Sequence, residues 1–240
     1  MEHAPQQLRF AVWPPPGSPV SVNSWMRELG EITRDRFAPP PFPEDAARGH
    51  GQPVIVVPGF CALDETTARL RRFLNRQGFA ARPWSCGPNL GPTRSALRAF
   101  ERLLVETADN YGAPIALVGI SLGGTIAREI AKRRPGHVAH VVTLLSPIHL
   151  PVPTPLAPLA RIASMVWADD SRERVREIAE PPPMPMTALV APRDGIVDWR
   201  CCVPDAAPNV ETVYVEGGHL TIGSNPQAQR IVAARLATVR

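Results

Sequence analysis

A serine flanked by two glycines lies in the run Gly119-Ile120-Ser121-Leu122-Gly123, between an apolar stretch and an amphipathic one. This placement predicts a tight turn from a strand into a helix, which exposes the hydroxyl and favours developing negative charge beside the helix N-terminus. A serine hydroxyl attacks only when a base takes its proton and an acid orients that base. Ser121 is therefore the candidate nucleophile of an acyl-transfer reaction.

The candidate base is His219, which follows Glu216-Gly217-Gly218 after the last predicted strand. We expect the base in a loop just after a strand, and His219 lies in such a loop. His149 also follows a strand but precedes the acid loop, so we assign it to the substrate pocket or a cap. Four other histidines lie before the predicted domain or at the start of a strand: His3, His50, His137 and His140.

Two aspartates compete for the acid role in the run from Arg193 to Asp198, after the fifth predicted strand. Asp194 is closer to the strand end, and the Gly195-Ile196-Val197 that follows provides a turn and then apolar residues that can pack the loop down. Asp198 is in that case the cap of a helix that begins at Trp199. We therefore favour Asp194.

The oxyanion of an acyl transition state needs preorganised N–H donors. One is expected from Leu122, the residue after the nucleophile. The other is expected from the backbone of Phe60 in the loop Pro58-Gly59-Phe60-Cys61, where Gly59 permits close approach. The alternative is that Pro58-Gly59 forms only a turn.

Apolar runs and amphipathic helices alternate from residue 52 onward, which is typical of an α/β fold with a mostly parallel sheet and helices on both faces. Asp64 and Thr93 are predicted helix N-caps, and Gly78 and Gly112 helix stops. The predicted strands are Val54 to Val57, Ala80 to Trp84, Ile115 to Val118, Val138 to Leu144, Met186 to Ala191 and Val210 to Val215. The predicted helices are Asp64 to Arg76, Thr93 to Asn110, Leu122 to Arg134, Trp199 to Ala206 and Pro226 to Val239.

The 29 prolines cluster and divide the chain. Residues 1–50 are predicted to form a proline-rich arm with a helical piece near Trp25 to Asp35. This arm either covers the sheet in an ordered form or presents a partner-binding surface at Pro39 to Pro43. Residues 51–240 form the predicted domain. It includes a cap insertion at about 147–185, in which a second helix is predicted to begin after Ser171. Four apolar residues at helical spacing in the insertion either bind an acyl chain or pack on the core: Leu156, Leu159, Ile162 and Val166.

Composition narrows the possible partners. The 240 residues are 44% hydrophobic with a net charge of only +4, which suits one α/β domain and argues against a nucleic-acid partner. The sequence has neither a signal-peptide pattern nor an apolar run of spanning length, so a soluble cytoplasmic protein is expected. The four cysteines are expected as free thiols, with a Cys61–Cys86 disulfide as the exception, and no metal or cofactor is predicted.

These residues together resemble the α/β-hydrolase superfamily of esterases and lipases over about residues 52–240. The run Trp84 to Pro92 is similar to a compact bacterial subgroup of triacylglycerol lipases and esterases. Two departures are Pro58-Gly59, where the family often has His-Gly, and the lack of the two strands that open larger members.

The resemblance implies a serine esterase or lipase acting on a small ester or lipid through an acyl-enzyme. An acyltransferase, a thioesterase or an amidase would use the same residues, and a non-catalytic binding protein would use the same fold. The acyl chain, the acceptor and the oligomeric state are left open.

Overall fold

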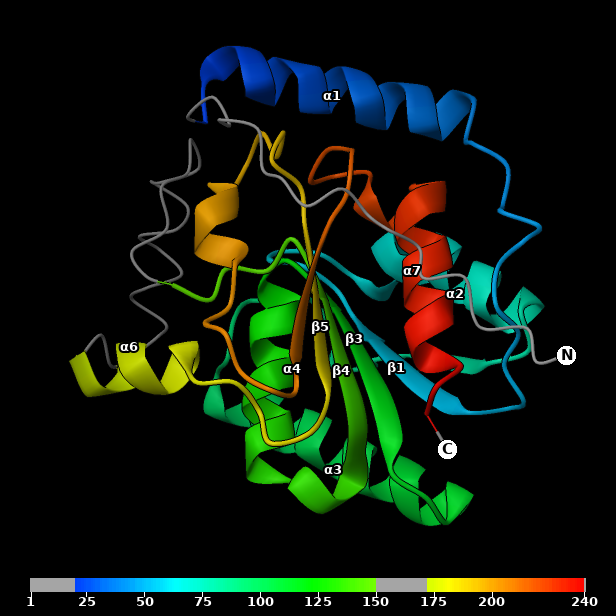
Figure 1. Ribbon diagram of the computed structural model, residues 1–240, viewed down its shortest axis with the longest axis vertical. Helices are drawn as coiled ribbons and strands as arrows, with labels where there is room; N and C mark the ends of the chain where they lie inside the picture. Colours follow the sequence, from blue (N-terminus) through cyan, green and yellow to red (C-terminus); the bar gives the residue numbers. More distant parts are fainter. Residues whose placement is uncertain (1–19, 150–171, 240) are drawn as a thin grey trace, which may run out of the picture.

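A sheet of six parallel strands in the order β2-β1-β3-β4-β5-β6 forms the centre of the protein. The computed structural model describes residues 20–149 and 172–239 (Figure 1). The sheet confirms the predicted α/β class. The strands are β1 (Pro53–Val57), β2 (Ala80–Pro83), β3 (Ile115–Ile120), β4 (Val138–Leu144), β5 (Met186–Val190) and β6 (Val210–Tyr214).

Helices cover both faces of the sheet (Figure 1). On one face lie α3 (Arg94–Tyr111) and α4 (Leu122–Arg133), and on the other lie α2 (Ala68–Arg76) and α7 (Pro226–Leu236). Because the strands are parallel, each connection must return along the sheet, and α2, α3 and α4 make this return between the first four strands. The loops that follow the strands therefore all meet at one edge.

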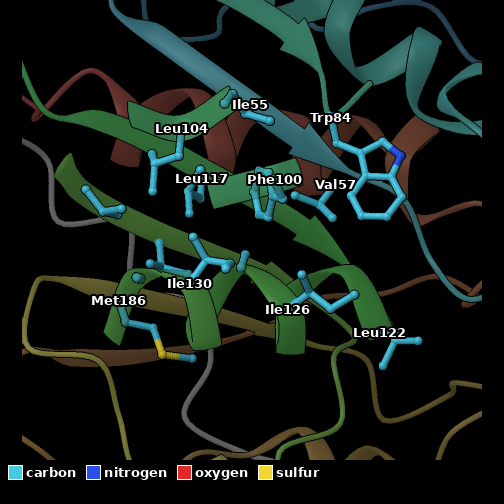
Figure 2. Close-up of a cluster of buried hydrophobic side chains, with 14 of the residues drawn as sticks. Ile55, Val57, Trp84, Phe100, Leu104, Leu117, Leu122, Ile126, Ile130 and Met186 are labelled. Atoms are coloured by element: carbon cyan, nitrogen blue, oxygen red, sulfur yellow. The ribbon is translucent and has the colours of Figure 1, made fainter. Parts of the chain in front are cut away.

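Two apolar clusters hold these layers together. Along β1, Ile55 and Val57 point to the α3–α4 face while Val54 and Val56 point to the α2–α7 face, as the alternation of strand side chains requires. Figure 2 shows the first cluster, in which Phe100 and Ile126 pack from the helices against the sheet. All five residues of β1 are buried, which explains its unbroken apolar sequence.

The described part of the N-terminal arm contains α1 (Val22–Phe37). This helix starts at a capping box in which Ser21 and Ser24 bond each other's backbone N–H. It lies across the carboxyl ends of the strands (Figure 1). Farther along the arm, Phe42 packs on Phe73 of α2 with ring centroids 5.8 Å apart. The predicted helical piece is thus a longer helix placed at the edge where the strands end.

Most of the predicted boundaries hold within one or two residues. Thr93 caps α3 through its side chain, and Gly112 ends that helix with φ of 66°. The insertion's second predicted helix is α6 (Arg172–Ala179). The shorter helices are η1 (Asp64–Thr67), η2 (Pro135–His137), η3 (Trp199–Cys202) and η4 (Ile222–Ser224), all of the 3₁₀ type.

Two local predictions are wrong. Asp64 is not an N-cap, because its carboxylate instead accepts the N–H groups of Trp84 and Ser85, at 3.1 and 3.2 Å. The helix expected from Trp199 to Ala206 is only the single turn η3, and Pro204, which has no N–H to donate, follows it closely.

Several predicted features fall outside the described residues. These are the four apolar residues of the insertion, Leu156, Leu159, Ile162 and Val166. Within the described ranges, no helix combines the length and the apolarity needed to cross a bilayer.

Candidate active site

Ser121 occupies a strained turn between β3 and α4. Its φ of 53° and ψ of −128° lie in a region that side-chain-bearing residues rarely adopt. Such a conformation costs about 1–3 kcal/mol and persists only where the surroundings impose it. Here the Ser121 N–H donates to the carbonyl of Leu144 in β4, at 2.8 Å. The turn thus presents the side chain at the carboxyl edge of the sheet, as the sequence predicted.

The two glycines of the motif make this turn possible through close packing. A Cβ placed on Gly119 would lie 2.3 Å from the Cα of Gly124, and one on Gly123 would lie 2.4 Å from the carbonyl oxygen of Val57. Neither position has room for a side chain, since the nearest atoms belong to backbone. Both positions of the motif therefore require glycine, because the start of α4 is in close backbone contact with β1 and β3.

Asp194 lies in the loop after β5 with its side chain fully buried. One carboxylate oxygen, Oδ1, accepts the N–H groups of Ile196 and Val197, at 2.8 and 2.9 Å. The other, Oδ2, lies 2.6 Å from Nδ1 of His219. Asp198 instead caps η3 by accepting the N–H of Arg200 at 3.0 Å, so the structure places only Asp194 on the histidine.

His219 lies in the loop after β6, and its ring is almost fully buried beside Asp194. Because a carboxylate only accepts, the short contact assigns the proton to Nδ1 and leaves Nε2 as the free base of the neutral ring. The loop then returns over the sheet edge toward the serine, since a Cβ placed on Gly223 would lie 3.3 Å from the Cδ1 of Ile120, the neighbour of Ser121.

The surroundings of His219 raise its pKa. Burial is the largest single influence and opposes protonation. The negative charge of Asp194, the hydrogen bond to it and the charge of Glu28 together outweigh burial, so the pKa lies above the ordinary 6.5. The site therefore favours the imidazolium that forms when a histidine takes a proton.

This shift predicts the pH dependence of any reaction in which His219 acts as a base. A protonated ring accepts no proton, and a raised pKa keeps the ring protonated to a higher pH. We expect the acid limb of kcat/KM for an ester substrate to have its midpoint above pH 6.5. A midpoint at or below the ordinary histidine value in a kcat/KM profile would contradict this assignment.

The loop after β1 runs directly beside Ser121. A Cβ placed on Gly59 would lie 3.4 Å from the Cβ and 4.0 Å from the Oγ of Ser121. Leu122 is the first residue of α4, where N–H groups have no carbonyl partner within the helix. The structure thus brings the loop of Phe60 and the start of α4 together around the serine. The oxyanion roles of the Phe60 and Leu122 amides remain predictions.

Asn89, which sequence reasoning did not single out, fastens this loop from the loop after β2. Its side chain is fully buried and donates to the carbonyl of Pro58 at 2.7 Å. Its backbone carbonyl accepts the N–H of Cys61 at 2.8 Å. A buried amide bonded in this way fixes the path of the loop beside Ser121.

No protein-family model matches the sequence, and no curated protein matches it. Solved structures match the fold over most of the chain. A monoacylglycerol lipase from Paleococcus ferrophilus aligns over 81% of this chain and 97% of its own, with a TM-score of 0.57 and 17% identity. An alpha/beta hydrolase enzyme from the sediment metagenome of the Mar Chica lagoon in Morocco aligns over 78% and 91%, with a TM-score of 0.53 and 17% identity.

The chain has the α/β-hydrolase fold. A thioesterase domain from the curacin biosynthetic pathway aligns over 80% of this chain and 92% of its own, with a TM-score of 0.51 and 14% identity. At these identities the matches establish the fold, and the resemblance seen in the sequence is confirmed at that level.

The structure places one further residue at the site that the sequence did not reveal, Glu28 of α1. Its carboxylate accepts N–H groups from the loops of both Asp194 and His219. The available signal was a carboxylate one turn after Trp25, which packs against the core. That signal has meaning only once the docking face of α1 is known.

The other histidines near the sheet have different partners. His149 lies after β4 with its Nε2 3.0 Å from the carbonyl oxygen of Val203, and its place in a substrate pocket remains a prediction. His140 lies early in β4, and its Nε2 is 3.1 Å from the hydroxyl of Thr187. Burial, with the nearby charge of Arg235, lowers the pKa of His140 to about 4.

All four cysteines are free thiols. Burial, followed by the charge of Asp64, raises the pKa of Cys86 to about 11. Burial, followed by the charge of Asp194, raises the pKa of Cys202 well above its ordinary value. These two thiols are therefore poor nucleophiles at neutral pH. Across the described residues, no three metal-binding side chains converge.

Proposed function

We propose that this protein is a serine hydrolase of carboxylic esters, with Ser121, His219 and Asp194 as its catalytic triad. The observation that carries the proposal is the buried pair in which Asp194 Oδ2 lies 2.6 Å from His219 Nδ1, at the edge where Ser121 occupies its strained turn. A buried acid that orients a histidine at the sheet edge where the serine lies is the arrangement that can activate a hydroxyl.

The proposed reaction proceeds in two halves. Ser121 Oγ attacks the ester carbonyl while His219 Nε2 takes the hydroxyl proton, and the amides of Phe60 and Leu122 stabilise the oxyanion. The carbon–oxygen bond to the alcohol breaks as His219 returns the proton to the leaving group. Water then attacks the acyl-enzyme with His219 again as base, which releases the acid and restores the serine.

Esters are proposed over thioesters and amides because of two likenesses. The run Trp84 to Pro92 is similar to a lipase and esterase subgroup. One structural neighbour is a monoacylglycerol lipase. A thioesterase domain is also among the neighbours, so thioesters are the first alternative to test.

The test is labelling of the native protein with a fluorophosphonate, together with turnover of p-nitrophenyl esters from acetate to palmitate. We expect stoichiometric labelling and ester hydrolysis, and the chain-length profile distinguishes an esterase from a lipase. Matched thioesters and an added alcohol acceptor test the alternative reactions. A folded protein that neither reacts with the probe nor turns over any ester would refute the proposal.

A further inference from the structure

Glu28 of α1 is fully buried, and its carboxylate bonds the two loops that carry the acid and the base. One oxygen, Oε1, accepts the N–H of Gly195 at 2.9 Å and the N–H of His219 at 2.8 Å. The other, Oε2, accepts the N–H of Leu220 at 3.0 Å. A single oxygen thus bridges the residue after Asp194 and the backbone of His219 itself.

The loops are shaped to receive the helix at this point. A Cβ placed on Gly195 would lie 2.5 Å from the carbonyl oxygen of Ser24, and one on Gly218 would lie 2.5 Å from Oε2 of Glu28. A side chain at either glycine would therefore push α1 away from the loops that carry Asp194 and His219. The guanidinium of Arg27 also donates to the carbonyl of Arg193, which adds a further contact with the acid loop.

We infer that Glu28 is a positioning residue, which holds the loops of Asp194 and His219 in register so that the imidazole faces the serine. The inference rests on the proposed function for its effect on turnover. A buried carboxylate is stable only where hydrogen bonds compensate for its lost hydration, and all three bonds seen here are charge-assisted. Placing them on two catalytic loops makes the alignment of those loops depend on the N-terminal arm.

The charge of Glu28 also acts on the base. The charged and titratable groups around His219 are Asp194 from the loop after β5, Glu28 with Arg27 and Glu31 from α1, and the buried thiol of Cys202 beside Asp194. Burial is the largest influence on the pKa of His219 and lowers it, while Asp194 and then Glu28 raise it. Removing the charge of Glu28 should therefore lower this pKa.

The decisive variant is Glu28→Gln, which keeps the shape of the side chain but removes the charge and turns an N–H₂ group toward backbone N–H donors. We expect kcat to fall about 10²-fold, the size of effect produced by a small misplacement of a catalytic group, with KM nearly unchanged. The acid limb of the rate profile should move to lower pH. The control is Asp35→Asn, which removes a carboxylate two turns farther along α1. It should change neither kcat nor the position of the acid limb.

A second measurement is independent of catalysis. The titration of the His219 ring is followed by NMR, with its signals assigned through His219→Gln, and the midpoint should be lower in Glu28→Gln than in the native protein. If the native protein fails to turn over esters, the proposed function fails while this comparison still decides the role of Glu28.

Two results would overturn the inference. The first is a folded Glu28→Gln with native kcat and a native His219 titration; a lower Tm in that case would mark a purely structural role. The second applies if Glu28→Gln does not fold. Glu28→Asp keeps the charge but loses reach, and native kcat in this variant would contradict positioning.

Discussion

Ser121→Ala is expected to abolish fluorophosphonate labelling and to lower ester turnover by about 10⁴-fold or more, as loss of a triad nucleophile does in known serine proteases. The change removes only the hydroxyl, so the loss would be chemical rather than structural. Intact-mass analysis of the labelled protein and kcat for a p-nitrophenyl ester measure the two effects. Labelling that persists in Ser121→Ala would show that another residue is the nucleophile.

A second variant at this position, Ser121→Gly, tests whether the turn is strained. Because Ser121 has φ of 53°, alanine retains the strain while glycine relieves it. We expect Ser121→Gly to be as inactive as Ser121→Ala but to have the higher Tm of the two. Equal Tm values would mean that the turn stores no strain that glycine can release.

Asp194→Asn is expected to lower kcat by about 10⁴-fold, the effect of the corresponding change in a serine protease triad. Asparagine can still accept the N–H groups of Ile196 and Val197 through its oxygen, so the loop is expected to hold. Its amide would then face Nδ1 of His219, which forces the ring proton onto Nε2. The ring would have no free nitrogen to accept the proton of Ser121.

Asp198→Asn is the control for this prediction, because the two aspartates were the alternatives for the acid. Asparagine is also a good N-cap, and the lost ion pair with Arg200 is exposed, so kcat should stay within about twofold of native. Circular dichroism spectra of both variants test whether they fold. A large loss in Asp198→Asn with native activity in Asp194→Asn would reverse the assignment.

The sequence by itself determined the features that depend on local geometry. The glycines around Ser121 predict its turn, because backbone fills the space where their side chains would lie. The alternation of apolar runs and amphipathic helices predicts the parallel sheet and places Ser121, Asp194 and His219 after the third, fifth and sixth strands. Order along the chain is enough here, since all parallel strands end at the same edge of the sheet.

Tertiary structure alone decided which distant groups meet at that edge. Asp194 and Asp198 lie in the same short segment after β5. Only the folded path of that segment brings Asp194 Oδ2 to 2.6 Å from His219 Nδ1. Asp64 looked like a helix cap but bonds the N–H groups after β2, and Asn89 fastens the loop beside Ser121. Nothing in the local pattern around these residues encodes partners that lie 20 or more positions away.

Glu28 is the clearest case of a role that the sequence could not reveal. It is 191 residues from His219 in the chain, within an arm that composition alone describes as proline-rich. Its position matters because α1 docks where two loops leave unpaired N–H groups, and that docking depends on the surfaces of separate elements. The sequence therefore predicted Ser121 and its partners, while the fold decided what holds those partners in place.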